Sequence, residues 1–317
     1  MAEQELKGTE AAAEAEAVDL DEFGTLLEKD FRVKEQDDSA KLHELVANLA
    51  LAAREKAGSA TISGNAVRSI KSLIAGIDEL LTTQMNQVLH APEIRRMEGS
   101  WRGLHYLVNN TETDTMLKIR VLNITKDELA DQLEDFEGQM WDQSPMFRKL
   151  YTEEYSSFGG APFGSIVGDY EFSHHPRDVG LLRNLSGICA SAHAPFIAAA
   201  SPRLFRMESW QELPNPQDLK MVTSSPDYAA WQSLRESEDA RYIGLTLPRV
   251  LARLPYGPDT IPVKGFDFRE EIDGKHDHYV WMNAAFPMGV NINRSHKLYG
   301  WGSQIRGVES GGAVTNL

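Results

Sequence analysis

The sequence predicts a mixed α/β (α+β) protein in which a helical N-terminal region precedes an α/β sheet domain. Apolar residues recur at helical spacing through residues 39–110, and after residue 113 short apolar runs alternate with helical patterns. Residues 1–17 are a low-complexity Ala/Glu stretch, which predicts disorder. Three regions are predicted. Residues 1–38 form an acidic tail with a helix and a linker, residues 39–112 form a helical region, and residues 113–317 form an α/β domain.

The N-terminal tail contains one short amphipathic pattern. Acidic residues separate the apolar side chains of a predicted helix, which are Leu20, Phe23, Leu26 and Leu27. Phe31 and Val33 then alternate with charged residues, which is typical of a short exposed strand or linker.

The helical region is predicted to contain three helices. The first covers residues 42–49 and is broken by the glycines of residues 58–64, and a longer one covers residues 67–81. Pro92 opens the third helix, because its ring suits the first helical position. One face of that helix carries Ile94, Met97, Trp101, Leu104 and Val108.

In the α/β domain, strands and helices are predicted to alternate. The expected strands cover residues 117–122, 165–172, 196–200 and 242–247. Thr125 and Glu128 form a capping box for a helix that runs to about Gly138. The further expected helices run from Ser144 to Gly159, from Pro176 to Ile188 and from Tyr228 to Arg241, with a Pro-rich loop at residues 201–226.

The composition excludes several classes of function. The formal net charge is -15, most of it in residues 1–40, and we find no basic cluster suited to nucleic acid or anionic lipid. Cys189 is the single cysteine, so an intrachain disulfide is excluded. The N-terminus does not resemble a signal peptide, and the longest apolar run, residues 188–200, is shorter than the roughly 20 residues of a membrane span. We expect a soluble cytoplasmic protein without membrane insertion.

Motifs for catalysis are weak. There is no P-loop, and Ser186 lacks the preceding glycine of a nucleophile elbow. Cys189 and His193 are one helical turn apart, but their apolar neighbours favour a buried, inert cysteine. His276 and His278 would share one face of a strand and could supply two metal ligands, although a surface His pair is the preferred interpretation. We predict no catalytic residue, cofactor or metal site.

Two other groups of residues are candidates for function. The acidic pairs Glu153–Glu154 and Glu270–Glu271 could perform acid–base chemistry if burial separated their pKa values, but solvated pairs are the usual case. Most of the tryptophans are expected in the core, with some at an interface: Trp101, Trp141, Trp210, Trp231, Trp281 and Trp301.

Three longer blocks carry a family resemblance. Residues 101–123 read WRGLHYLVNNTETDTMLKIRVLN, and residues 147–172 contain EEY, FGG-x-PFG and GDYEF. Residues 247–312 contain LPRVLARLPYG, GFDFREE, HDHYVWMNAAF and YGW-x-x-x-IRGVESGG. Together these blocks resemble the large subunit of the contractile sheath of the bacterial type VI secretion system (the TssC/VipB family). The resemblance implies a contractile-tail-sheath fold and a structural role.

The resemblance also implies partners. The small sheath subunit (TssB/VipA type) would form a heterodimer with this chain, and many heterodimers would build a helical tube around an inner tube of hexameric rings. A ClpV-type AAA+ unfoldase would recycle the contracted tube by recognising an N-terminal helix, which corresponds here to residues 18–29. The alternative is that this helix packs on its own chain. The family linkers imply that residues 31–34 add a strand to a neighbouring subunit.

The sequence departs from the family pattern in one large way. Family members continue beyond the IRGVE-x-GG block, whereas this chain ends at Leu317. The resemblance therefore implies an α/β domain that is incomplete at the C-terminus. Two other readings stay open from the residues alone. One is a hydrolase or metal enzyme that uses His276 and His278, and the other is a soluble adaptor in which the N-terminal helix carries the function.

Overall fold

The computed structural model describes residues 66–136, 138–213, 218–307 and 311–314. The predicted amphipathic helix with Leu20, Phe23, Leu26 and Leu27, the linker with Phe31 and Val33, and the helix at residues 42–49 lie outside these ranges. The chain divides into two units. The described part of the first unit comprises residues 66–91 and Pro255–His278, and that of the second comprises Pro92–Leu254 and the described residues from Tyr279 onward.

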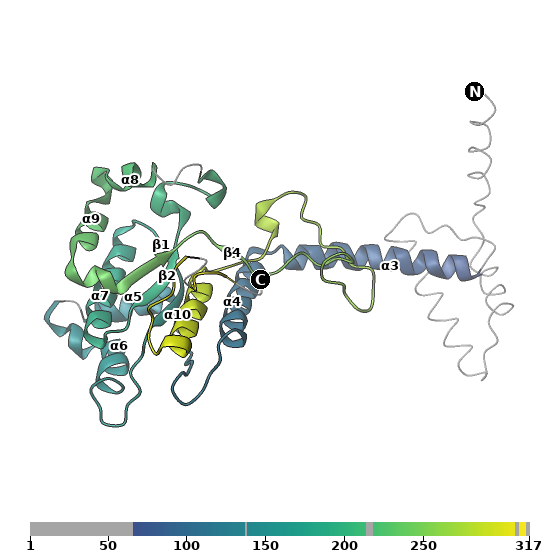
Figure 1. The fold of residues 1–317 in the computed structure, drawn as a ribbon. Coiled ribbons are helices and arrows are strands. Elements are labelled where there is room, and N and C mark those ends of the chain that lie inside the picture. Colours follow the sequence, from purple (N-terminus) through teal and green to yellow (C-terminus); the bar gives the residue numbers. More distant parts are fainter. Residues whose placement is uncertain (1–65, 137, 214–217, 308–310, 315–317) are drawn as a thin grey trace. The chain divides into compact units, whose positions relative to one another are not determined.

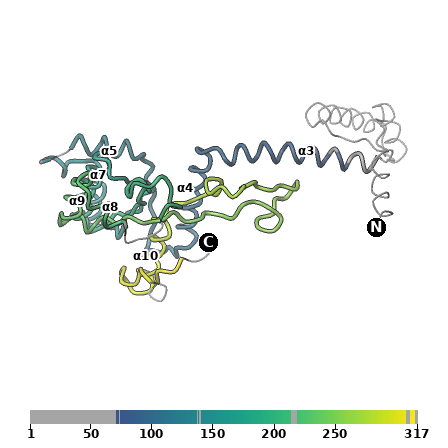
Figure 2. The backbone as a smooth tube through the Cα atoms, turned by 90° about the horizontal axis from the view of Figure 1, so that it is seen from above, coloured from purple at the N-terminus to yellow at the C-terminus, as the bar shows by residue number. Residues whose placement is uncertain are grey.

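The first unit is a long helix with an irregular segment along it. Helix α3 (Ala66–Leu89) confirms the predicted helix and extends it. Pro255–His278 runs beside α3 in both views (Figures 1 and 2). The Asn86 side chain joins them, because its amide donates to the carbonyl of Arg269 over 3.3 Å and its oxygen accepts from the backbone N–H of Glu271 over 3.2 Å.

The second unit contains most of the described helices and all of the described strands. Its helices are α4 (Pro92–Asn109), α5 (Lys126–Glu134), α6 (Pro145–Phe147), α7 (Pro176–Ala192), α8 (Asp218–Thr223), α9 (Ala229–Glu236) and α10 (Ala285–Tyr299). Its strands are β1 (Ile166–Phe172), β2 (Phe196–Ala200), β3 (Ile243–Thr246), β4 (Val250–Leu251) and β5 (Trp281–Met282). A π-helical turn at Arg148–Thr152 follows α6.

The centre of the second unit is a parallel sheet in the order β1-β2-β3. Phe196 of β2 stands opposite Ile166 of β1 and Ile243 of β3, and α7 connects β1 to β2. Successive residues of β1 face opposite sides of the sheet. Phe172 packs with the core of α7, whereas Val167 packs with the core formed by α4 and α10. Helices therefore cover both faces of the sheet, which confirms the predicted α/β class.

Local signals fix several element ends as predicted. The Thr125 hydroxyl accepts from the backbone N–H of Glu128, and the Glu128 carboxylate accepts from the N–H of Thr125, which completes the capping box at α5. The Ser144 hydroxyl caps α6 by accepting from the N–H of Phe147. Pro176 occupies the first turn of α7, which ends at His193 in a left-handed conformation.

One predicted strand is wrong. Residues 117–122 form no strand, and the backbone of residues 118–123 makes no hydrogen bond to the described part of the chain. Ile119 packs against the core of α4 and α10, but the side chain of Val121 is 69% exposed. The apolar alternation is present, yet a strand also needs a neighbouring strand to pair its backbone groups.

Several helix boundaries also differ from the prediction. The helix that begins after Thr125 ends at Glu134 rather than near Gly138, and the one that begins after Ser144 ends within the π turn. Helix α7 continues past Ile188, and the expected helix at residues 228–241 is split into α9 and a 3-10 helix, Glu238–Tyr242. The expected loop at residues 201–226 contains α8 and short 3-10 turns.

Candidate interaction surfaces

The candidate nucleophiles are part of the core of the second unit. Cys189 is buried, and burial raises the pKa of its thiol to about 12, so it stays protonated. The ring of His193 lies within hydrogen-bond distance, 3.0 Å, of the Tyr242 hydroxyl. The Ser186 hydroxyl donates to the Arg183 carbonyl over 2.7 Å. The structure thus confirms the interpretation of Cys189 as a buried, inert cysteine, and Ser186 is buried as well.

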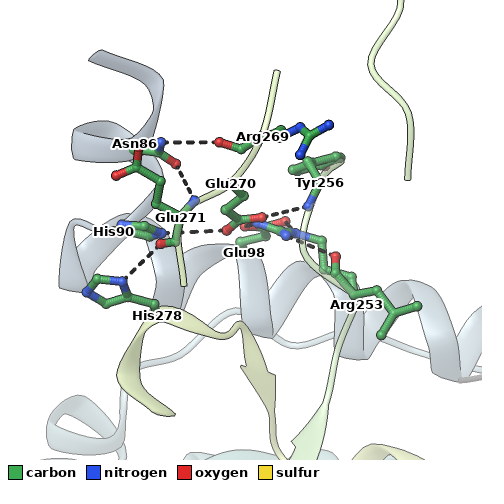
Figure 3. A network of polar contacts seen from close by, with 10 residues as sticks. Asn86, His90, Glu98, Arg253, Tyr256, Arg269, Glu270, Glu271 and His278 are labelled. Carbon is green, nitrogen blue, oxygen red and sulfur yellow. Dashed lines mark hydrogen bonds and ion pairs between the residues drawn. The ribbon is translucent and has the colours of Figure 1, made fainter. Parts of the chain in front are cut away.

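A buried carboxylate organises the irregular segment of the first unit (Figure 3). Glu270 accepts from the backbone N–H of Tyr256 over 2.9 Å, and its other oxygen lies 3.8 Å from Nε2 of His90. The Glu270 side chain is 1% exposed. The prediction of a solvated Glu270 is therefore wrong, because the backbone N–H of Tyr256 replaces water that this carboxylate would otherwise bind.

The candidate metal-ligating histidines lie in a 3-10 helix (His276–His278) and not on a strand. The His278 ring stacks on His90 with centroids 4.1 Å apart, and its Nδ1 lies 3.1 Å from the Glu271 carbonyl oxygen (Figure 3). Among the described residues, no three His, Cys, Asp or Glu side chains are placed to hold a metal ion. The first unit uses these side chains to hold its own backbone.

The second unit has its own buried ion pair (Figure 3). Glu98 of α4 accepts hydrogen bonds over 2.6 Å from both Arg102 and Arg253. Burial alone would raise the pKa of Glu98, but the hydrogen bonds from Arg253 and Arg102 outweigh it and hold the pKa below its ordinary value. The Arg253 side chain is 3% exposed, so the pair ties α4 to the segment after β4.

One face of α3 is an exposed apolar stripe, which we call the α3 stripe: Ile74, Leu81, Met85 and Val88, which are 52%, 41%, 40% and 51% exposed. Ile74, Leu81 and Val88 recur every seventh residue, and the half-buried Ile77 lies at the intervening heptad position. The first unit covers the other side of the helix, where Asn86 is buried. The stripe has the spacing by which one helix packs along another.

Helix α4 of the second unit carries a second exposed stripe. Met97, Trp101 and Val108 are 52%, 67% and 45% exposed, while Gly99, Gly103, Tyr106 and Leu107 form the buried face. The predicted grouping of Met97, Trp101 and Val108 on one face is consistent with the helix. Sequence reasoning missed that the glycine-containing face is the one in the core, because glycines add no apolar signal.

The expectation that most tryptophans lie in the core is wrong. Trp101, Trp141 and Trp301 are 67%, 38% and 69% exposed, and the other three are half-buried. Exposed apolar surface of this kind is typical of protein–protein interfaces, where Trp is enriched. Among the described helices, none is long and apolar enough to cross a lipid bilayer.

Comparisons with known proteins identify the family of this chain. The sequence model of the VipB family, described as the tail sheath N-terminal domain, matches residues 71–317. The type VI secretion system sheath protein TssC1 of Pseudomonas aeruginosa is 55% identical over 297 residues, which are 93% of this chain and 59% of that protein. The chain thus spans about three fifths of the length of this curated relative. This chain belongs to the TssC/VipB family of type VI secretion tail sheath proteins.

Proposed function

We propose that this chain acts as the large structural subunit of a type VI contractile sheath and binds the small sheath subunit through the α3 stripe. The α3 stripe is the observation that carries this proposal, because the described part of the first unit leaves Ile74, Leu81 and Val88 exposed. Membership of the sheath family supports an assembly role over an enzymatic one. The small sheath subunit would supply an amphipathic helix that covers the stripe.

The spacing of the stripe supports a helical occupant. Side chains that recur every seven residues drift by only about 20° per repeat around a straight helix, so they form one stripe that suits a second helix packed along it with knobs in holes. The β-branched Ile74 and Val88 share one heptad position with Leu81, and Ile77 lies at the position that a partner helix would also contact. Burial of such residues drives association through the hydrophobic effect.

Leu81→Asp should weaken binding of the small sheath subunit by at least about 30-fold, because a charge in the centre of an apolar interface costs about 2 kcal/mol or more. The matched control is Thr83→Asp, which adds the same charge at an exposed position of α3 that does not belong to the stripe. Titration of labelled small subunit measures both affinities. Equal losses for the two variants would contradict the proposed surface.

Tube formation would follow the pairing of this chain with the small sheath subunit. Heterodimers would stack into a helical tube around an inner tube of hexameric rings, and contraction of the outer tube would expel the inner one. The linker with Phe31 and Val33 would add a strand to a neighbouring copy. Assembly and contraction of the sheath would take place in the cytoplasm.

We propose that the N-terminal helix is the segment that an unfoldase binds when it recycles the contracted sheath. An apolar face on an acidic tether suits a groove on a ClpV-type AAA+ unfoldase. Phe23→Ala should therefore weaken binding of the unfoldase's N-terminal domain by about tenfold, while Glu22→Ala on the polar side should leave it within about twofold. Calorimetric titration of both variants checks this. An unchanged affinity for Phe23→Ala would mean that the helix packs elsewhere.

A further inference from the structure

Met85 is the one sulfur-containing residue of helix α3. It is 40% exposed, and it follows Leu81 by four residues and precedes Val88 by three, so it lies within the α3 stripe. The sequence of α3 contains no cysteine, tryptophan, tyrosine or histidine. Met85 is therefore the side chain through which an oxidant would change the α3 stripe.

The single cysteine of the chain does not compete with Met85 for an oxidant. Peroxides attack the thiolate of a cysteine rather than the thiol. Cys189 is buried, and burial raises the pKa of its thiol to about 12, so the thiolate does not form at neutral pH. A thioether has no proton to lose, so its reaction with peroxide depends on its exposure and not on its ionisation.

Exposure separates the methionines of the described chain into two groups. One group is 8% exposed or less, and Met282, at 2%, is its most deeply buried member. The other group is at least 40% exposed: Met85, Met97, Met116, Met140 and Met221. Within this exposed group, Met85 alone belongs to the α3 stripe, so oxidation of the others leaves that surface unchanged.

Oxidation of Met85 would make one point of an apolar surface polar. A sulfoxide oxygen accepts hydrogen bonds, and a partner helix on the α3 stripe would bury it beside Leu81 and Val88, whose side chains donate none. A buried polar group without a partner costs free energy, so the pairing would weaken. The free chain would lose little, because the sulfoxide then faces water and Asn86 still joins α3 to the irregular segment.

We propose that Met85 is a peroxide-sensitive site that controls the pairing of this chain with the small sheath subunit. Hydrogen peroxide transfers one oxygen atom to the Met85 sulfur: the O–O bond breaks, a sulfur–oxygen bond forms and water leaves, so the sulfur is oxidised by two electrons and the peroxide is reduced. A methionine sulfoxide reductase reverses this step, because the oxygen leaves as water while two thiols become a disulfide. The effect rests on the proposed sheath function and regulates the same surface.

Oxidation followed at each methionine tests the site directly. The chain is treated with hydrogen peroxide alone and in complex with the small sheath subunit, and mass spectrometry measures the oxidised fraction of every methionine. In the free chain, Met85 should be oxidised at least about tenfold faster than the buried Met282. In the complex, Met85 should react at least about fivefold more slowly, whereas the rate at Met116, which is 82% exposed, should change less than about twofold.

Binding before and after peroxide treatment provides the second test, with each variant compared with its own untreated form. Oxidation of the wild-type chain should weaken binding of the small sheath subunit by about tenfold, and treatment with the reductase should restore it. Met85→Leu keeps an apolar side chain without the thioether, so peroxide should change its affinity less than about twofold. Met116→Leu is the matched control, because it removes a thioether outside the stripe and should keep the loss of about tenfold.

The outcomes separate the role of Met85 from the pairing. A folded, untreated chain that does not bind the small subunit contradicts the pairing, and the control by Met85 falls with it. If the untreated chain binds, the role of Met85 alone is overturned by a peroxide effect that persists in Met85→Leu, by oxidation of Met85 no faster than that of Met282, or by loss of helix in the circular dichroism spectrum of the oxidised chain. A reversible loss of binding that Met85→Leu abolishes supports it.

Discussion

Replacement of Arg253 by methionine should destabilise the second unit by about 3 kcal/mol, because the half-buried Glu98 carboxylate would keep only its hydrogen bond from Arg102. Arg253 donates to both carboxylate oxygens of Glu98, over 2.6 and 3.2 Å. Water can replace it only in part, since the Arg253 side chain is 3% exposed and the Glu98 side chain 17% exposed. Urea denaturation followed by circular dichroism measures the loss.

Arg249→Met is the matched control. Arg249 also makes two hydrogen bonds to one carboxylate, that of Glu171, but the two side chains are 43% and 37% exposed. Solvent screens such a pair, and its removal should cost less than about 1 kcal/mol. If the two arginine variants lose equal stability, the burial argument for the Glu98 pair is wrong.

The same ion pair predicts a dependence on pH. The pKa of Glu98 is lower in the folded chain than its ordinary value of 4.5, so its stabilisation is present above that value and is lost as the pH falls through the folded pKa. In Arg253→Met, the pKa of Glu98 should be higher than in the wild type, because only Arg102 then opposes the effect of burial. The difference in stability between wild type and Arg253→Met should therefore narrow below about pH 4.5.

Gly99→Ala should cost about 3 kcal/mol, a large effect for one methyl group, because the added carbon would lie 2.3 Å from the backbone oxygen of Trp281. A flexible side chain could move aside, but this atom belongs to β5. Helix α4 and β5 would therefore have to separate, and the core around Phe286 would open with them. The midpoint of urea denaturation reports the change.

The control for Gly99→Ala is Gly180→Ala on α7. Gly180 has open space where its side chain would be, so the substitution should stabilise the helix by up to about 1 kcal/mol. The two variants make the same chemical change in a helix of the same unit, and the expected effects have opposite sign. A Gly99→Ala variant as stable as wild type would show that α4 does not pack on β5 as described.

Local chemistry made part of the fold predictable from the sequence. The apolar run at residues 196–200 and the capping box of Thr125 and Glu128 each fix an element through neighbouring residues, and the structure has both. Residues 117–122 have an equally good strand pattern but form no strand. Strand formation depends on a partner that is distant in sequence, which no local pattern reveals.

The candidate surfaces were predictable in spacing but not in exposure. The helical period of α3 is visible in the sequence, yet it does not say that Leu81 and Val88 are left exposed. The burial of Glu270 was missed for the same reason, because the Tyr256 N–H that binds it is fourteen positions away. In both cases the answer depends on how an irregular segment returns along a helix, which follows from long-range packing.

The most direct test of the account is co-expression of this chain with a small sheath subunit, followed by size-exclusion chromatography of the tagged complex. The account predicts co-elution of the two chains as a stable complex that Leu81→Asp disrupts and Thr83→Asp preserves. If the wild-type chain is folded by circular dichroism and still elutes without the small subunit, the proposed pairing through the α3 stripe is contradicted.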